Sequence, residues 1–249
     1  MNIGLYQSAS ALSALERWQD VVSQNITSAQ NTGYRKRTVN FSTQLSGELQ
    51  TDPSGRVGQD GGTPAVFPKI NTGINFISGE TLATRRDMDV AIQGEGFFEV
   101  QMQDGTKAYT RSGEFRMRTD RVLVSTGGQE VMSTSGNPIT LLPGGGDMTI
   151  NQDGTIFQGT TSLGKISVQK FADNSQLKPL AGGYFIPQDG VQPEQVEKPE
   201  LLQGYLEGSN VSSLREMVDM VLISRAYEAN QKIISTAEET MQKTLDALG

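Results

Sequence analysis

The sequence predicts a mixed α and β fold, in which discontinuous N- and C-terminal helices form a coiled-coil-like domain and the centre forms an all-β domain. Both ends of the 249-residue chain carry apolar residues at alternating spacings of three and four. Between the two ends, short β-prone runs alternate with turn signals, and the 28 glycines indicate a turn-rich chain. The predicted domains are residues 1–40 with 206–249, an extended connector at 41–85, and a β-rich domain at 86–205.

Residues 3–30 are predicted to form the first helix. They contain no proline, and polar Ser8 and Gln19 interrupt the apolar stripe, so the stripe is a narrow seam and not a broad core face. Gly33 supplies a plausible stop, because glycine tolerates the left-handed cap conformation. The basic cluster Arg35-Lys36-Arg37 follows, where cations would favour the helix dipole. The seam positions are Leu5, Leu12, Leu15, Val22 and Ile26.

The second helix is predicted to begin at Ser213, because Ser213 and Glu216 have the spacing of a capping box. No proline or glycine interrupts the chain before Gly249. Such a helix of roughly 35 residues is about 50 Å long, so it must find partners outside a compact core. The seam residues of both helices are therefore predicted to form an assembly interface; in this helix they are Met220, Ile223, Tyr227, Ile234, Met241 and Leu248.

The centre is predicted to be β-structure. Residues 97–102, 122–125 and 166–171 are β-prone, and Asp104-Gly105 and Asp153-Gly154 sit between extended runs where tight hairpins need a positive backbone angle. Prolines and glycines break residues 42–85 repeatedly, so this connector is predicted to be extended or disordered before assembly.

Composition argues against several functional classes. The net charge of −7 and sequence pI near 4.8 disfavour nucleic-acid binding. With no cysteine, thiolate metal sites and cysteine nucleophiles are excluded, and with no histidine a Ser-His-Asp triad cannot be built. No run approaches the ~20 apolar residues of a membrane span, and the N-terminus lacks the features of a secretory signal. We therefore expect no membrane insertion, and export without a cleaved signal peptide.

Carboxylates offer the first enzymatic possibility. The densest acidic group is Asp87, Asp89, Glu95 and Glu99, but alternating polar residues on a half-exposed sheet explain it without a site. Two Ser-x-x-Lys spacings, at 162–165 and 175–178, lack the partner motifs of a serine nucleophile. We predict no catalytic, cofactor-binding or metal site, and a protein that is not an enzyme.

Three segments resemble one family, in order along the chain. They are SQNITSAQNTGYRKR at 23–37, DMDVAIQGEGFFEVQMQDGTKAYTRSGEFRM at 87–117, and residues 206–248 with Ser209-Asn210-Val211 and Arg225-Ala226-Tyr227-Glu228. They are similar to segments of the flagellar basal-body rod and hook proteins, and the middle one resembles the proximal and distal rod subgroup, FlgF and FlgG. One departure is that Arg118 and Arg121 stand in a turn where the family usually has an acidic residue and a glycine.

The resemblance implies a structural subunit that polymerises helically into the drive shaft of the flagellum. Such a subunit transmits torque from motor to hook and encloses the export channel. It implies a place in the periplasmic part of the rod, with partners among itself, other rod, hook and ring proteins, and the flagellar export apparatus. Phe41 is a candidate for export recognition. The alternative from another class is a secreted adhesin or phage-tail-like fibre, and a polysaccharide-degrading enzyme ranks behind it.

Overall fold

The computed structural model describes residues 3–45 and 66–247. The chain divides into two units, a helical unit of residues 1–27, 37–73 and 212–249 and a β unit of residues 28–36 and 74–211. This division assigns residues 28–36 to the β unit, and it assigns much of the sequence-predicted connector to the helical unit. Both units are discontinuous, so each needs segments that are far apart in the chain.

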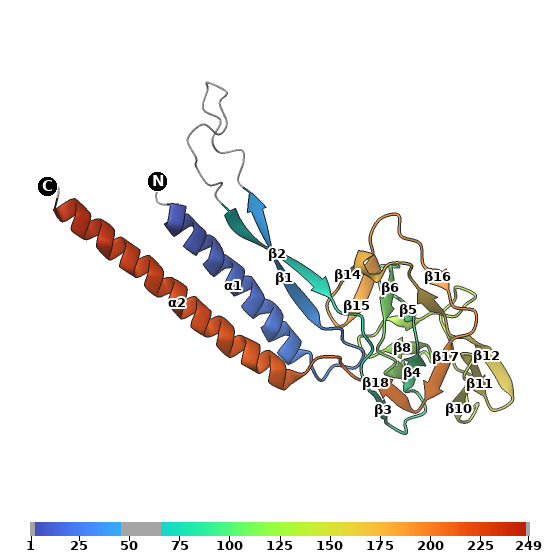
Figure 1. Ribbon diagram of the computed structural model, residues 1–249. Coiled ribbons are helices and arrows are strands. Elements are labelled where there is room, and N and C mark those ends of the chain that lie inside the picture. The colour runs from blue at the N-terminus through green and yellow to red at the C-terminus, as the bar shows by residue number, and fades with distance from the viewer. Residues whose placement is uncertain (1–2, 46–65, 248–249) are drawn as a thin grey trace. The chain divides into compact units, whose positions relative to one another are not determined.

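The helical unit contains α1 (Ile3–Thr27), α2 (Ser213–Asp246) and a two-stranded sheet of β1 (Arg37–Leu45) and β2 (Val66–Ile74). The last residue of β2, Ile74, is assigned to the β unit. In Figure 1, α1 and α2 lie side by side along most of the length of α1. The predicted start of α2 at Ser213 is confirmed. Gly33 has a φ of +68°, and a Cβ there would lie 2.3 Å from the backbone nitrogen of Ser112, so this position needs glycine for two reasons.

Strand structure enters the predicted connector at three places. β1 ends inside it, β2 lies within it, and β3 (Thr81–Ala83) pairs with a strand near the start of α2. The described parts of the connector therefore include paired strands, although its prolines and glycines gave no signal for them. Residues 46–65 of the connector lie outside the described residues, and the expectation for them stays a prediction.

The β unit is built from short strands. Its largest sheet has nine strands. Seven follow the order β14-β15-β6-β5-β9-β8-β7, β13 also pairs with β5, and β16 pairs with β13. A three-stranded sheet has the order β10-β11-β12, and β17 pairs with β4 and β18 with β3. The bounds are β4 Val90–Gln93, β5 Phe97–Gln101, β6 Lys107–Thr110, β7 Phe115–Met117, β8 Leu123–Ser125, β9 Glu130–Val131, β10 Met148–Ile150, β11 Thr155–Gln158, β12 Thr161–Lys165, β13 Val168–Lys170, β14 Leu177–Pro179, β15 Tyr184–Pro187, β16 Glu194–Gln195, β17 Glu200–Gln203 and β18 Tyr205–Glu207, with a 3-10 turn at Asn174–Gln176.

An extensive core fills the β unit. Phe98 and Phe115 are fully buried and meet edge to face at 5.1 Å between ring centroids. A second, aromatic cluster gathers Phe97, Tyr109, Phe171, Leu177 and Phe185. The two clusters draw on strands from every part of the unit, so the core forms only when the whole sheet is assembled.

The predicted hairpin turns are present. Gly105 and Gly154 have φ values of +83° and +87°, and the Asp104 carboxylate accepts a hydrogen bond from the backbone of Thr106 at 2.9 Å. The hairpin between β7 and β8 also forms, although Arg121 takes the place of the usual glycine and adopts a φ of +67°. Asp120 lies in this turn and forms an ion pair with Arg118 at 2.6 Å.

Candidate assembly surface

The seams of the two helices close on each other within one chain. Leu15 and Val22 of α1 and Ile223 of α2 form a buried cluster, with Trp18, Ile26, Met220 and Tyr227 packed around it. Leu12 and Ile234 are half-buried, whereas Met241 stays 43% exposed. The side chain of Leu5 and the whole of Leu248 lie outside the described residues. The burial of the residues in this cluster is thus accounted for by α1 meeting α2 within one chain.

A polar contact crosses the seam in the described part of the helices. The side-chain amide nitrogen of Asn25 donates to the Glu216 carboxylate at 2.9 Å, from a residue 191 positions away in the chain. The same side chain donates to the carbonyl of Arg37 and accepts from its backbone N–H, both at 2.9 Å. Asn25 and Glu216 are each 1% exposed. Asn25 therefore joins α1, β1 and α2, and Glu216, predicted as a capping residue, also has a partner on the other helix.

A second apolar face on α2 points away from α1. An α-helix turns about 100° per residue, so these positions lie roughly opposite Ile223 and Tyr227. The exposed fractions are Leu214 76%, Met217 51%, Val218 54%, Val221 52% and Leu222 53%. We call these five residues the outer face. By contrast, the exposed residues at 13, 16, 17, 19, 20, 23 and 24 on α1 are all polar or charged.

The sequence contains a signal for the outer face, which the seam pattern does not include. Its five members also follow spacings of three and four, offset from the seam by about half a turn. Further along α2, a hollow on the helix surface continues the apolar character with small residues. It is lined by Ala229, Lys232, Ile233, Thr236, Ala237, Thr240, Met241 and Thr244.

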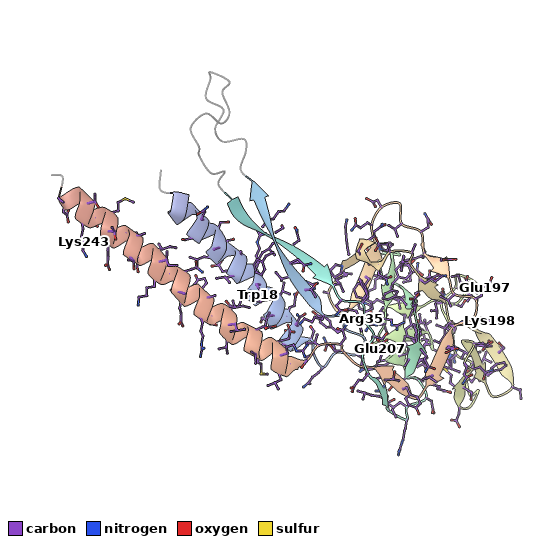
Figure 2. The ribbon with its side chains drawn as sticks, in the orientation of Figure 1. Trp18, Arg35, Glu197, Lys198, Glu207 and Lys243 are labelled. Carbon is purple, nitrogen blue, oxygen red and sulfur yellow. The ribbon has the colours of Figure 1, made fainter. Side chains whose placement is uncertain are left out.

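Three buried charged residues of the β unit, Arg35, Arg111 and Glu207, form an ion triad. Glu207 pairs with Arg35 at 2.6 Å and with Arg111 at 2.8 Å, and the three side chains are only 2–3% exposed. Figure 2 shows Arg35 and Glu207 meeting. Burial lowers the pKa of Arg111, although the Glu207 charge opposes this shift. The reading of the basic cluster as a helix cap is wrong, because α1 ends at Thr27 with no basic residue in its last turn.

Asn210 fastens two other segments beside the triad. Its carbonyl oxygen accepts from the backbone N–H of Lys36 at 2.6 Å, and its amide donates to the carbonyls of Asn75 and Ile77. The backbone N–H of Gly33 also donates to the carbonyl of Glu207 at 2.7 Å. Asn210, which lies in the C-terminal segment that resembles the flagellar family, thus connects its own segment to those around Lys36 and Asn75 within the β unit.

The aromatic ring of Phe41, the candidate for export recognition, meets Trp18 edge to face at 5.4 Å. Phe41 is 51% exposed, so one side of the ring faces solvent while the other contacts α1. Trp18 packs against the buried cluster at the seam.

The four acidic residues predicted to be structural divide into two buried ones, Asp89 and Glu99, and two exposed ones, Asp87 and Glu95, which lie outside the strands. Burial would raise the pKa of Glu99, but hydrogen bonds from Lys107 and Ser167, the Lys107 charge and a bond from Gln169 together hold the pKa below its ordinary value. Burial and the charge of Glu99 raise the pKa of Tyr109 to about 12.

Among the described residues, no three acidic side chains are grouped to hold a metal ion. No helix in the described part of the chain is long and apolar enough to cross a membrane.

Profiles of known families match both units. Residues 91–158 match the flagellar hook protein FlgE/F/G D1 domain, and residues 202–247 match the C-terminal region of the flagellar basal body rod FlgEFG proteins. These two matches, one in the β unit and one that includes α2, place the chain in the class of flagellar hook and rod proteins.

Full-length relatives narrow the class. The chain is 32% identical to the basal-body rod protein FlgF of Caulobacter vibrioides, over 100% of this chain and 99% of the relative. It is 29% identical to FlgG of Agrobacterium fabrum over 93% and 94%, and 28% identical to FlgF of Rhizobium meliloti over 100% and 99%. The chain belongs to the flagellar basal-body rod protein family and is a structural subunit of the rod. The alternative of an adhesin or phage-tail-like fibre is set aside.

Proposed function

We propose that the α1–α2 pair is the assembling element of this rod subunit, and that the outer face of α2 packs against helices of neighbouring copies in a helical polymer. The observation that supports this most directly is the pair of opposed apolar faces on α2. One face is covered by α1, and the other leaves Leu214, Met217, Val218, Val221 and Leu222 at least half exposed.

The energetics favour a partner for this face. Full burial of a side chain of this size contributes roughly 1.5 to 3 kcal/mol, so even partial burial of five of them supports a stable contact. The face lies on one side of α2 only, and a contact between unlike surfaces of identical copies continues indefinitely if the rotation does not close. An open helical filament is the symmetry that a shaft requires.

The seam residues serve the same assembly in our proposal by holding the two helices together. Met241, the most exposed seam residue described, extends the apolar surface towards the hollow at 229–244. Ordering a residue costs about 1 to 2 kcal/mol, and the buried α1–α2 cluster is small, so neighbouring copies would complete the stability of this unit.

The wider role follows from family membership and this surface. We propose that the polymer forms the periplasmic part of the rod, transmits torque from motor to hook and encloses the export channel. Its partners would be other copies, the adjoining rod, hook and ring proteins, and the flagellar export apparatus, which would deliver the chain. We propose no catalytic activity.

The assembly proposal is tested by Val221→Asp, with Gln231→Asp as the matched control at an exposed polar position of α2. We expect Val221→Asp to be secreted and folded but to be missing from purified basal bodies, and Gln231→Asp to assemble normally. Circular dichroism of the two purified variants should show equal helix content, because both positions are exposed in the monomer. Normal incorporation of Val221→Asp would contradict the proposed contact.

Export recognition by Phe41 is a separate proposal, supported by its half-exposed ring. Phe41→Ala should reduce secretion of the subunit into the periplasm. Because the ring also contacts Trp18, the control is Trp18→Ala, which removes the same contact and leaves Phe41 in place. Equal secretion defects in the two variants would assign the effect to folding, and efficient secretion of Phe41→Ala would reject the proposal.

A further inference from the structure

The seam between α1 and α2 is formed mainly by side chains that would tolerate sliding. Leu15, Val22 and Ile223 could each meet another apolar residue if one helix moved along the other by about one turn. The burial of apolar area, which is not directional, would change little in such a move. Apolar packing alone therefore stabilises the pair but specifies its register weakly.

Two asparagine side chains on the seam side of the helices, Asn230 and Asn25, make different kinds of hydrogen bond. The side-chain amide of Asn230 donates to the carbonyl of Ala226 one turn earlier in its own helix, at 2.9 Å, and this bond would survive any slip of α2. The bond from Asn25 to Glu216 crosses between the helices and exists in one register only. Both of its residues are fully buried, so water could not replace the lost partner.

Asn25 is also held by contacts that do not involve α2. Its side chain makes two hydrogen bonds with the backbone of Arg37, which fix it against the first residue of β1. A slip of α2 by one turn would take the Glu216 carboxylate about 5 Å away from this donor. Moving a buried carboxylate away from a hydrogen-bond donor is unfavourable.

We propose that the Asn25–Glu216 contact is a register lock, which sets the height at which α2 lies along α1 and thereby the position at which the outer face is presented. Apolar burial supplies the stability of the helix pair, and the polar contact selects one arrangement among several of similar burial. A buried polar residue has this role in coiled coils, where it specifies register at some cost in stability. Asn25 and Glu216 act as positioning residues, since neither lies on the outer face.

The lock is tested by distance measurements on the full-length monomer. The natural chain has no cysteine, so Gln19→Cys and Gln231→Cys, at exposed positions of α1 and α2, place two spin labels without further changes. Pulsed electron paramagnetic resonance then reports the distance between the two labels, which changes when one helix moves along the other. Glu216→Met removes the acceptor but keeps the volume and leaves the bonds between Asn25 and Arg37 intact, and Glu216→Gln is the conservative control that retains an acceptor oxygen.

In the labelled protein with its natural Glu216, and in the Glu216→Gln control, we expect one narrow distance distribution. In Glu216→Met we expect a distribution that broadens or splits by about the length of one turn, ~5 Å, at unchanged helix content. A narrow, unshifted distribution in Glu216→Met would overturn the proposal. Loss of helix content in that variant would also overturn it, because the contact would then supply stability and not register.

The lock and the proposed assembly contact can fail separately. The distance measurement needs no polymer, so a negative result there would leave the proposed assembly through Val221 standing. Normal incorporation of Val221→Asp into basal bodies would in turn leave the lock standing, because Asn25 and Glu216 are buried within the chain.

Discussion

The two units of this protein use apolar side chains in opposite ways. In the β unit, seventeen buried residues form one cluster and five more form an aromatic one, so most large apolar side chains there are covered by their own unit. In the helical unit, three buried residues form the cluster, and six large apolar residues described on α2, the five of the outer face and Ile233, are half or more exposed. The difference is that the β unit covers most of its own apolar side chains, whereas the helical unit leaves an apolar surface that our proposal assigns to contacts with other copies.

The largest expected difference in stability is between replacing a buried apolar residue of the β unit and replacing an exposed one of the outer face. Phe115→Ala should lower the free energy of unfolding of the β unit by about 4 kcal/mol, because a fully buried ring leaves a cavity. Leu214→Ala, on the outer face, should change the stability of the monomer by less than about 0.5 kcal/mol. Urea unfolding monitored by tryptophan fluorescence for the helical unit and by circular dichroism for the whole chain measures both. A large effect of Leu214→Ala in the monomer would break the comparison.

The ion triad should be the next most sensitive element. Glu207→Gln leaves the buried guanidinium groups of Arg35 and Arg111 without a charged partner, and we expect a loss of about 3 kcal/mol in the β unit. The control is Glu194→Gln, which breaks an exposed ion pair with Lys170 and should have no measurable effect. Similar melting temperatures for the two variants would show that the triad is not a stabilising centre.

Adjacent isoleucines of α2 sharpen the comparison within the helical unit. Ile234 is half-buried on the seam, whereas Ile233 is 58% exposed. Ile234→Asp should lower the stability of the helix pair by about 2 kcal/mol and block rod assembly, because it brings a charge to the seam. The melting of the β unit should not change. Ile233→Asp should leave the monomer's helix content unchanged, and if both variants lost helix equally, the seam would not be the side of α2 that packs on α1.

The β7–β8 turn offers a stabilising change of smaller size. Arg121 adopts a φ of +67°, a conformation that is unfavourable for residues with a side chain. Arg121→Gly should therefore raise the free energy of unfolding of the β unit by about 1 kcal/mol, partly offset by the greater flexibility of glycine in the unfolded chain. Thermal unfolding with Arg116→Gly as a strand control, which should destabilise, measures the effect. A loss of stability in Arg121→Gly would mean that its side chain contributes more than the strain costs.

The smallest expected effect is on acid stability. The folded-state pKa of Glu99 lies below its ordinary value of 4.5, so Glu99 contributes stability that is present above that pH and lost as the pH falls through the folded-state pKa. Glu99→Gln should therefore make the loss of β-unit stability below about pH 4.5 shallower. Urea midpoints measured from about pH 6 to about pH 3 test this. An unchanged slope would place the acid sensitivity on other carboxylates.

Sequence patterns predicted the elements that depend on neighbours in the chain. The start of α2 at Ser213, the glycine turns at Gly105 and Gly154 and the β character of the centre are all confirmed. The role of Arg35 could not be predicted in the same way, because its partner Glu207 is distant in sequence. A basic residue just beyond a helix resembles a cap unless its actual partner is known.

By itself, the sequence determined that this protein has two long helices with apolar seams and a β-rich centre, because helical and strand periodicities are written in local spacings. Only the tertiary structure decided which apolar face of α2 is covered, since the seam and the outer face have the same spacing. It also brought Asn25 to Glu216, because a contact between distant residues depends on how whole elements pack and not on any local pattern.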